Sequence, residues 1–366
     1  MQKHLIILGI RGVPAAHGGF ESFAEHLAPW MVQHGWKVTV YCQGSDAGKW
    51  YEDLWKGCRR IHVPVKLENA IGTIEFDIKS TLDAVKQDAI LLTLGYNTGF
   101  LSVYARMRGA FNLINMDGIE WRRDKYTKAQ QIYLWLNERM AAASGNVLIA
   151  DHPEIVRHHS SHVPAGKIEM IPYGSDHIDT ADAALLDRFG IRPDKFFTVI
   201  ARPEPENSLR EIVRAFSRKP RGMKLVVLGK YDRAHAYHLS VLDAASDEVV
   251  FPGAIYDKPT LHALRLYSLA YIHGHQVGGT NPSLVEALGA GNAVIAHDNP
   301  FNRWVAGDAG YFFLDEDECE QQIERLITVP EAGTALRTAA RMRWEAAFSW
   351  PRILADYMAL IERCRL

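Results

Sequence analysis

The sequence predicts two doubly wound α/β domains, each a mostly parallel sheet with helices on both faces. The chain has 366 residues, of which 48% are hydrophobic and 23% charged, so it exceeds the usual size of a single hydrophobic core. Short apolar runs alternate with longer helix-periodic segments, which is the pattern of a parallel sheet. This alternation occurs twice along the chain.

The first series of elements begins near the N-terminus. Its apolar runs are short enough to be strands, and the segment 20–34 between two of them has apolar residues at helical spacing. The predicted strands of this series are Leu5–Ile10, Lys37–Tyr41, Ala89–Leu94, Phe111–Asn115 and Val147–Ala150.

The second series repeats this pattern. Its predicted strands are Phe196–Ala201, Lys224–Leu228, Glu248–Phe251, Leu269–Ile272 and Ala293–Ala296. The interval 171–195 between the two series has the most linker-like composition, so we place the boundary near residue 178. The expected domains are 1–177 and 178–345, followed by a C-terminal helix over 346–366 that returns to the N-terminal domain.

Composition excludes several classes of protein. Lys and Arg number 41 against 43 Asp and Glu, so the average surface does not attract nucleic acid. The cysteines are scattered, without metal-ligand spacing, which favours a reducing cytoplasm; they are Cys42, Cys58, Cys319 and Cys364. No stretch approaches the roughly 20 apolar residues that span a bilayer. We therefore expect a cytoplasmic protein whose membrane contact, if any, is peripheral.

The first candidate site is Gly18-Gly19, after the first predicted strand and directly before a helix. Paired glycines allow a backbone to approach a ligand closely, and the helix N-terminus favours anions. The spacing is not that of a dinucleotide-binding fingerprint, which disfavours a nicotinamide dehydrogenase. An ordinary glycine-rich turn is the alternative.

The second candidate is the block from His273 to Asp298. An N-cap residue, a proline at the first helical position and Gly291 at the exit predict a short helix over Pro282–Ala290. Glu286 lies one turn into it, where a carboxylate can accept hydrogen bonds from a ribose diol; a solvated helix residue is the alternative. The residues expected to bind a ligand's phosphates here are Gly279, Thr280, Asn281 and Ser283.

The third candidate is Arg202, immediately after the first strand of the second series. Ligands of open α/β sheets bind at the carboxyl ends of the strands, and a guanidinium matches diphosphate oxygens. The alternative is a surface arginine paired with Glu204 or Glu206.

A metal or cofactor is not expected. The histidines, including His158, His159, His162, His273 and His275, lack the spacing of known metal motifs, and no acidic pair ends a strand. Arg, backbone amides and helix dipoles must then offset the diphosphate charge.

One segment, 106–128, is locally basic and aromatic, unlike the chain as a whole. Such a face suits an anionic membrane surface and a polyprenyl-diphosphate-linked molecule bound there. The alternative is a set of solvated charges around a buried Trp121. The residues concerned are Arg106, Arg108, Arg122, Arg123, Lys125 and Lys128, with Tyr104, Phe111, Trp121 and Tyr126 between them.

These features together resemble the retaining GT-B glycosyltransferases, a large family that includes mannosyl- and sucrose-forming enzymes. The segments GIRGVPAAHGGFE, NMDGIEWRR, ARPEPEN and GHQVGGTNPSLVEAL are similar to the bacterial rhamnosyltransferase branch that builds surface polysaccharide. The likeness covers nearly the whole chain. It implies a nucleotide sugar, with dTDP-rhamnose the best candidate, bound in an interdomain cleft mainly by the C-terminal domain. The N-terminal domain would hold the saccharide acceptor.

The resemblance also assigns roles to single residues. In the family, a second Glu, separated by seven intervening residues from the position of Glu286, closes on the ribose with it, but this chain has Gly278 there. The partner lysine of the diphosphate arginine is replaced by Asn207. Asp117 falls where many members carry a His near the donor sugar; a turn-forming aspartate is the alternative.

The expected chemistry is a front-face displacement with retention, without metal or covalent nucleophile. Asp117, Arg202 and Glu286 are the predicted catalytic residues. A nucleotide-sugar epimerase of the same fold, or a non-catalytic sugar-nucleotide-binding protein, would share the binding residues.

Overall fold

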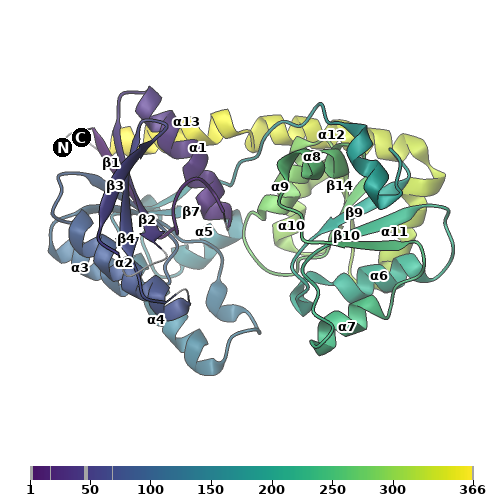
Figure 1. Ribbon diagram of the computed structural model, residues 1–366, viewed down its shortest axis with the longest axis horizontal. Helices are drawn as coiled ribbons and strands as arrows, with labels where there is room; N and C mark the ends of the chain where they lie inside the picture. Colours follow the sequence, from purple (N-terminus) through teal and green to yellow (C-terminus); the bar gives the residue numbers. More distant parts are fainter. Residues whose placement is uncertain (1–2, 17, 45–47, 68, 365–366) are drawn as a thin grey trace. The chain divides into compact units, whose positions relative to one another are not determined.

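The computed structural model describes residues 3–16, 18–44, 48–67 and 69–364. They form two compact units, the first comprising Met1–Pro172 with Trp350–Leu366 and the second Tyr173–Ser349 (Figure 1). Each unit is a sheet of mainly parallel strands with helices on both faces, which confirms the predicted fold class. Among the described residues, no helix is both long and apolar enough to cross a membrane.

The sheet of unit 1 has the strand order β3-β4-β2-β1-β5-β6-β7-β8. All neighbouring strands are parallel except β3 and β4, which form an antiparallel hairpin at the edge. The sequence analysis did not predict this hairpin. The strands are β1 (His4–Leu8), β2 (Lys37–Gly44), β3 (Tyr51–Trp55), β4 (Cys58–Pro64), β5 (Ile90–Leu94), β6 (Phe111–Asn115), β7 (Val147–Ala150) and β8 (Ile168–Met170).

The helices of unit 1 cover both faces of this sheet. They are α1 (Gly19–Gln33), α2 (Ala70–Ala84), α3 (Phe100–Met107), α4 (Lys128–Ser144), α5 (Pro153–Ser160) and α13 (Trp350–Arg363), with the 3-10 turns η1 (Glu120–Arg122) and η2 (Ala165–Lys167). Helix α13 packs against α1, with the rings of Phe23 and Tyr357 4.5 Å apart. The Tyr357 hydroxyl accepts a buried hydrogen bond of 3.0 Å from Asn115 Nδ2, so the end of the chain supports the end of β6.

The sheet of unit 2 is entirely parallel, with the order β11-β10-β9-β12-β13-β14. Its first strand, β9, therefore lies in the middle, and the order in which strands are added to the sheet reverses between β9 and β12. The strands are β9 (Phe196–Ile200), β10 (Lys224–Leu228), β11 (Val249–Gly253), β12 (Ala270–His273), β13 (Ala293–His297) and β14 (Gly310–Phe313).

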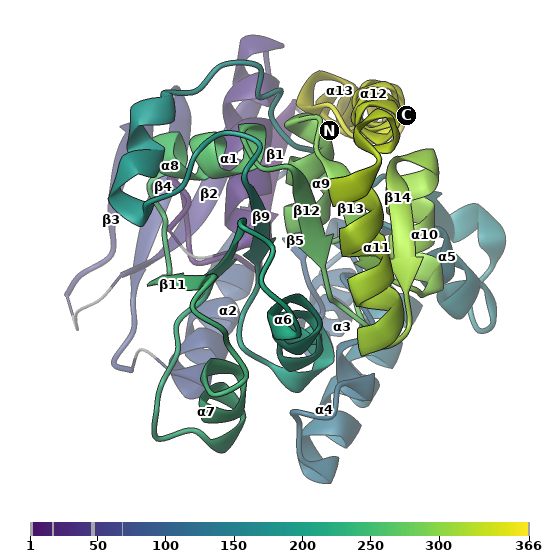
Figure 2. The ribbon, with the colours of Figure 1, turned by 90° about the vertical axis from the view of Figure 1, so that its right-hand side faces the viewer.

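Alternate residues of these strands face opposite helical layers. Phe197 packs in a core with α6, α7 and α11, whereas Phe196 packs against α8; Figure 2 shows α6 and α11 in front of the row of strands. The helices of unit 2 are α6 (Leu209–Ser217), α7 (Ala236–Leu242), α8 (Lys258–Leu266), α9 (Pro282–Gly289), α10 (Pro300–Ala306), α11 (Glu316–Thr328) and α12 (Pro330–Ala347), with the 3-10 turns η3 (Ala183–Phe189), η4 (Pro205–Asn207) and η5 (Gly307–Ala309).

The unit boundary lies five residues before the predicted position of 177/178. Ser175 belongs to unit 2 because its N–H donates to Phe348 O at 2.9 Å and its hydroxyl donates to Val285 O at 3.0 Å. The linker-like interval is also partly core, since Ile178 and Leu186 are buried. At the C-terminal end, unit 1 resumes at Trp350 rather than at residue 346.

Candidate functional site

The carboxyl ends of β9 and β12 form the strand-order reversal of unit 2, where ligands of open α/β sheets bind. The two strands are parallel neighbours, with Phe197 opposite Ala270. Arg202 follows β9, and the loop that leads to α9 follows β12. The structure therefore brings two of the predicted segments to one edge of the sheet.

Close contacts hold the loop after β9 against the loop after β12. A side chain at Gly274 would lie 2.1 Å from the carbonyl oxygen of Asn207, so only glycine allows this approach. Ser208 has a φ of 49°, and its hydroxyl donates a hydrogen bond to Gly274 O at 2.9 Å. Gln276 Nε2 in turn donates to the Ser208 hydroxyl at 2.9 Å. The edge is preorganised before any ligand binds.

Helix α9 begins as the sequence predicts. Asn281 Oδ1 accepts a hydrogen bond of 3.0 Å from the N–H of Ser283, and Pro282 is the first helical residue. The Ser283 hydroxyl accepts from Tyr271 at 2.9 Å and donates to Ile200 O at 3.3 Å. The Ser283 N–H, expected to be accessible to a phosphate, is thus engaged by the cap. The role of Asn281 and Ser283 visible here is to hold α9 against the end of β9.

Arg202 is exposed, and among the described residues its guanidinium forms neither a hydrogen bond nor an ion pair. The alternative, an ion pair of Arg202 with Glu204 or Glu206, is therefore not present among the described residues. Asn207, which replaces the family's lysine, is buried and donates from Nδ2 to Arg202 O at 2.8 Å. It supports the backbone of Arg202 and is not a second cation for a diphosphate.

The glycine that replaces the family's first glutamate has a backbone reason. Gly278 has a φ of 134°, a conformation that residues with side chains rarely adopt. Apart from Gly278 and its two chain neighbours, no atom of the described residues lies within 4 Å of the position that a Cβ would take. Backbone conformation, rather than lack of space, therefore selects glycine here.

Glu286 is partly exposed, at 39% of its side chain, and forms an ion pair with Arg265. Arg265, on α8, is 4% exposed, and its Nη1 has no hydrogen-bond partner among the described residues. One oxygen of Glu286 is thus held by a buried cation, and the side chain is not the freely solvated residue of the alternative reading. Sequence reasoning missed Arg265, because nothing marks a helical arginine 21 positions away as its partner.

Replacing Glu286 by Gln is expected to weaken binding of a free nucleoside diphosphate about 10-fold, since the amide loses one accepting oxygen and the charge. The melting temperature should also fall, because Arg265 loses its anionic partner. Calorimetric titration well below the melting temperature separates the two effects. Glu316→Gln, which breaks an exposed pair with Arg214 and Arg218, is the matched control. Unchanged nucleotide affinity in Glu286→Gln would remove Glu286 from the site.

In unit 1, Gly18 caps α1 and Gly19 is its first residue. Glu21 lies at this helix start, buried, and its Oε1 accepts a hydrogen bond of 3.2 Å from the N–H of Arg11. A Cβ on Gly18 would stand 2.9 Å from Glu21 Oε2. The chain's own carboxylate therefore occupies part of the space that the sequence suggested for an anion.

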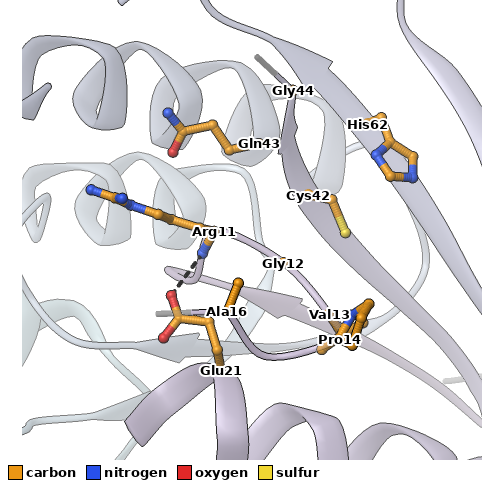
Figure 3. Close-up of a pocket in the computed structure, with 10 residues that line it drawn as sticks. All are labelled: Arg11, Gly12, Val13, Pro14, Ala16, Glu21, Cys42, Gln43, Gly44 and His62. Carbon is orange, nitrogen blue, oxygen red and sulfur yellow. Dashed lines mark hydrogen bonds between the residues drawn. The ribbon is translucent and has the colours of Figure 1, made fainter. Parts of the chain in front are cut away.

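A cavity of about 310 Å³ opens beside this loop, at the ends of β1 and β2 (Figure 3). Its wall combines a carboxylate, an amide, an imidazole and the exposed guanidinium of Arg11, whose side chain has no partner among the described residues. Such a mixture suits a ligand rich in hydroxyl groups. The sequence analysis did not single out this wall, which is lined by Arg11, Gly12, Val13, Pro14, Ala16, Glu21, Cys42, Gln43, Gly44 and His62.

Asp117 lies directly beyond β6 with a φ of 51°. Its N–H donates to Asn115 Oδ1 at 3.0 Å. Burial, together with the nearby charge of Glu120, raises the pKa of Asp117 to about 6. A carboxyl group with a raised pKa in a strained backbone is typical of functional sites. Asp117 lies at the same edge of the unit 1 sheet as Gly18 and Gly19, two strands away from β1.

The basic segment 106–128 does not form one face. Phe111 is part of β6, and Arg106 Nη1 donates to Ser144 O at 3.4 Å. Arg123 is paired with Glu120 at 3.0 Å. The cations of this segment that remain exposed beside α4 are Arg122, Lys125 and Lys128, and the following turns of α4 expose Ile132, Trp135 and Leu136.

Two family models match successive parts of the chain. Residues 2–176 match a domain of unknown function (DUF1972), and residues 187–343 match glycosyl transferases group 1. The curated proteins contain no sequence that matches this chain significantly.

Solved structures share the whole fold. Sucrose-phosphate synthase from Thermosynechococcus elongatus superposes with a TM-score of 0.83 at 17% identity, covering 100% of this chain and 99% of its own. HepE of Anabaena in complex with UDP and glucose gives 0.77 at 14% identity, covering 99% and 100%. The UDP-forming α,α-trehalose-phosphate synthase of Burkholderia xenovorans, in complex with glucose-6-phosphate, gives 0.73 at 13% identity, covering 98% and 100%. Residues 187–343 thus match the model of glycosyl transferases group 1, and the chain as a whole has the GT-B fold.

Proposed function

We propose that this protein transfers a sugar from a nucleotide sugar to a saccharide acceptor with retention of configuration, and that the donor is dTDP-rhamnose. The observation that carries the proposal is the exposed, unpaired guanidinium of Arg202 at the reversal point of β9 and β12. It lies in a domain of the glycosyltransferase group 1 type. A diphosphate leaving group needs such a cation where its charge develops.

In the proposed reaction, the acceptor hydroxyl oxygen bonds to the anomeric carbon on the face that the diphosphate leaves. The bond between that carbon and the diphosphate oxygen breaks, and the hydroxyl proton passes to the departing diphosphate. Arg202 and the backbone around Gly279 and Thr280 stabilise the leaving charge. Glu286 binds the ribose. Asp117 accepts a hydrogen bond from the donor sugar or stabilises positive charge at the anomeric carbon.

The donor is identified by a thermal-shift screen of dTDP-rhamnose against UDP- and GDP-sugars. UDP-glucose belongs in the screen because HepE was solved with UDP and glucose. A donor at 100 times its dissociation constant stabilises the protein by about 2.7 kcal/mol. NMR of the product's anomeric proton then tests retention. Epimerised donor without acceptor would instead identify an epimerase, and binding without any turnover would identify a binding protein.

Transfer should persist in excess EDTA, because we propose that Arg202, backbone amides and the α9 dipole offset the diphosphate charge without a divalent cation. Initial rates with and without chelator, followed by addition of Mg²⁺, provide the measurement. A complete loss of activity that Mg²⁺ restores would contradict metal-independent transfer.

We also propose a lipid-linked acceptor at the cytoplasmic face of the inner membrane. The exposed apolar side chains Ile132, Trp135 and Leu136 of α4, beside the exposed cations Arg122 and Lys125, support this proposal. Apolar groups that enter the interface, flanked by cations that attract anionic headgroups, are typical of peripheral membrane contact.

Sedimentation with liposomes tests the membrane contact. Binding should require anionic lipid, weaken with salt and fall at least about 10-fold in Arg122→Glu/Lys125→Glu, since each basic residue contributes about 1 kcal/mol. Lys230→Glu/Arg233→Glu, which reverses two exposed cations of unit 2, is the charge-matched control. Equal sedimentation of both variants would exclude α4 as the docking face without affecting the transfer reaction.

A further inference from the structure

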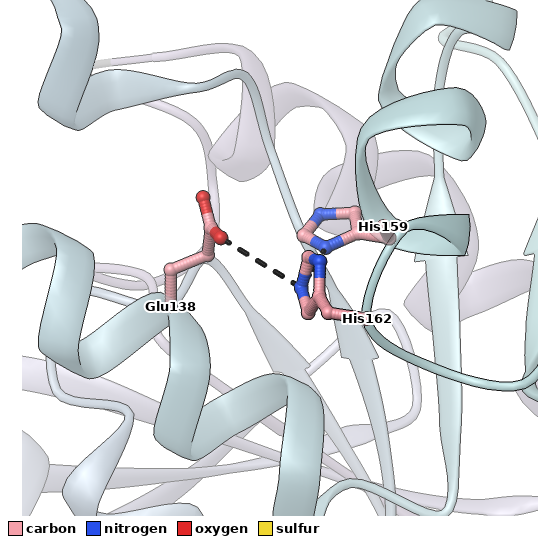
Figure 4. Close-up of side chains that lie close together, drawn as sticks. All are labelled: Glu138, His159 and His162. Atoms are coloured by element: carbon pink, nitrogen blue, oxygen red, sulfur yellow. Dashed lines mark hydrogen bonds and ion pairs between the residues drawn. The ribbon is translucent and has the colours of Figure 1, made fainter.

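Glu138 and three histidines meet in unit 1, and none of the four has been assigned a role in sugar transfer. Glu138 comes from α4, His158 and His159 from the last turn of α5, and His162 from the residues just after it. Glu138 and His159 are each 1% exposed. Figure 4 shows the Glu138 carboxylate directed towards the two imidazoles of His159 and His162. A cluster of this kind was not expected from the sequence, where the histidines lack motif spacing.

The two histidine nitrogens are spaced as a small tetrahedral ion requires, and the carboxylate lies somewhat further away. One ligand atom each from Glu138, His159 and His162 lie within 4.8 Å of one another. His159 Nδ1 and His162 Nε2 are 3.4 Å apart, and His162 Nε2 is 3.9 Å from Glu138 Oε1. Zinc–nitrogen bonds of about 2.0–2.1 Å place tetrahedral ligands about 3.3–3.4 Å apart. The two histidine nitrogens already have this separation. The carboxylate must move by about 0.5 Å towards His162, and also towards His159, because the three ligand atoms are held only within 4.8 Å of one another.

The chemistry of the donor set also favours zinc. It offers two imidazole nitrogens and one carboxylate oxygen, and zinc commonly binds these ligand types in proteins.

A second layer of hydrogen bonds orients the carboxylate. Trp121 Nε1 donates to Glu138 Oε2 at 2.7 Å, and His158 Nε2 lies 3.0 Å from Oε1. Partners of this kind commonly hold the ligands of protein metal sites in place. Oε1 is the oxygen nearer His162, so the bond from Trp121 to Oε2 can remain when a cation binds.

We propose that Glu138, His159 and His162 bind a zinc ion, with water as the fourth ligand on the partly exposed side of His162. Magnesium and calcium prefer all-oxygen sets. Neighbouring ligands of an octahedral ion of similar size lie about 2.9–3.0 Å apart, closer than these. The site joins α4 to the end of α5. Through Trp121 of η1 it also supports the loop that carries Asp117, so the ion has a structural role.

Cobalt substitution tests the proposal on untagged, chelator-treated protein. Co²⁺ should produce the visible absorption bands of tetrahedral coordination, saturating at one ion per chain, and Zn²⁺ should displace it and raise the melting temperature. His162→Ala removes a ligand at the most exposed position and should abolish the bands. Trp121→Phe should keep them and weaken the affinity by about 10-fold, because it alters only the outer layer.

The control is His235→Asn/His238→Asn, which removes a histidine pair with rings 4.2 Å apart in unit 2. It should leave the cobalt spectrum unchanged. Circular dichroism establishes that His162→Ala is folded, and if it is not, Glu138→Gln takes its place. Wild-type protein without tetrahedral bands, or bands retained in the ligand variant and lost in the control, would overturn the site. Because Mg²⁺ does not fill a nitrogen-rich site, the outcome is separable from the Mg²⁺ rescue that tests metal-independent transfer.

Discussion

Arg202→Ala is expected to lower the rate constant of sugar transfer about 10²- to 10³-fold, the loss typical of removing one preorganised group that stabilises transition-state charge. The effect should appear mainly in kcat, because the charge on the diphosphate oxygen grows as the glycosidic bond breaks. The KM for the donor should rise less. Initial rates at varied donor concentration, with saturating acceptor, provide the measurement.

Arg192→Ala is the matched control. Arg192 is also exposed, and it precedes β9 at the opposite edge of the same sheet, so its loss removes a charge without touching the site. Its kcat should equal that of the wild type. If the kcat of Arg202→Ala lies within about threefold of the wild-type value, the loss is too small for a transition-state contact. Another group would then have to stabilise the leaving diphosphate.

Asp117→Asn is expected to lower transfer about 10- to 100-fold at pH 7.5, the cost of losing a hydrogen bond to a charged group. Asparagine is the suitable replacement because it tolerates the positive φ that Asp117 adopts. In the wild type, activity should fall as pH drops through about 6, where Asp117 becomes protonated. This acid limb should be absent from the variant.

The stability of the same variant should change in the opposite direction. The pKa of Asp117 is higher in the folded protein, at about 6, than its ordinary value of 3.8. The contribution of Asp117 to the stability of the folded protein is therefore greatest below pH 4 and declines as pH rises to about 6. Asp117→Asn avoids this decline and should melt at a higher temperature than wild type at pH 7.5. Asp77→Asn is the control, because the pKa of Asp77 is also raised to about 6 by burial, and it should keep the acid limb. An Asp117→Asn variant that is less stable than the wild type at pH 7.5 would contradict the raised pKa of Asp117 in the folded protein.

The fold class was predictable because its signals are local. Each buried strand is a run of neighbouring apolar residues, and helix α9 is specified by Asn281, Pro282 and Gly291 within a single short segment. Capping and φ preferences act between residues a few positions apart, so the sequence reveals them directly. The antiparallel hairpin of β3 and β4 was missed, since polar residues break its apolar pattern.

The candidate site was only partly predictable. Arg202 and α9 were placed at one edge because parallel strands bring their carboxyl ends together. The buried partner of Glu286 and the carboxylate beside Gly18 were not foreseen, because Arg265 and Glu21 carry no sequence signal of these contacts. Likewise, the sequence suggested that the basic side chains around residue 123 are unpaired and exposed, whereas Arg123 is paired with Glu120.

Local sequence signals were therefore sufficient for the two α/β units, for helix α9 and for the position of Arg202 at a strand end. The tertiary structure alone decided which side chains meet across elements: Arg265 with Glu286, Asn115 with Tyr357, and Glu138 with the histidines at the end of α5. The physical reason is that such pairs are separated by 20 or more positions and are joined only when helices pack on the sheet. A buried charge is stable only with its partner, but packing, and not spacing in the chain, selects that partner.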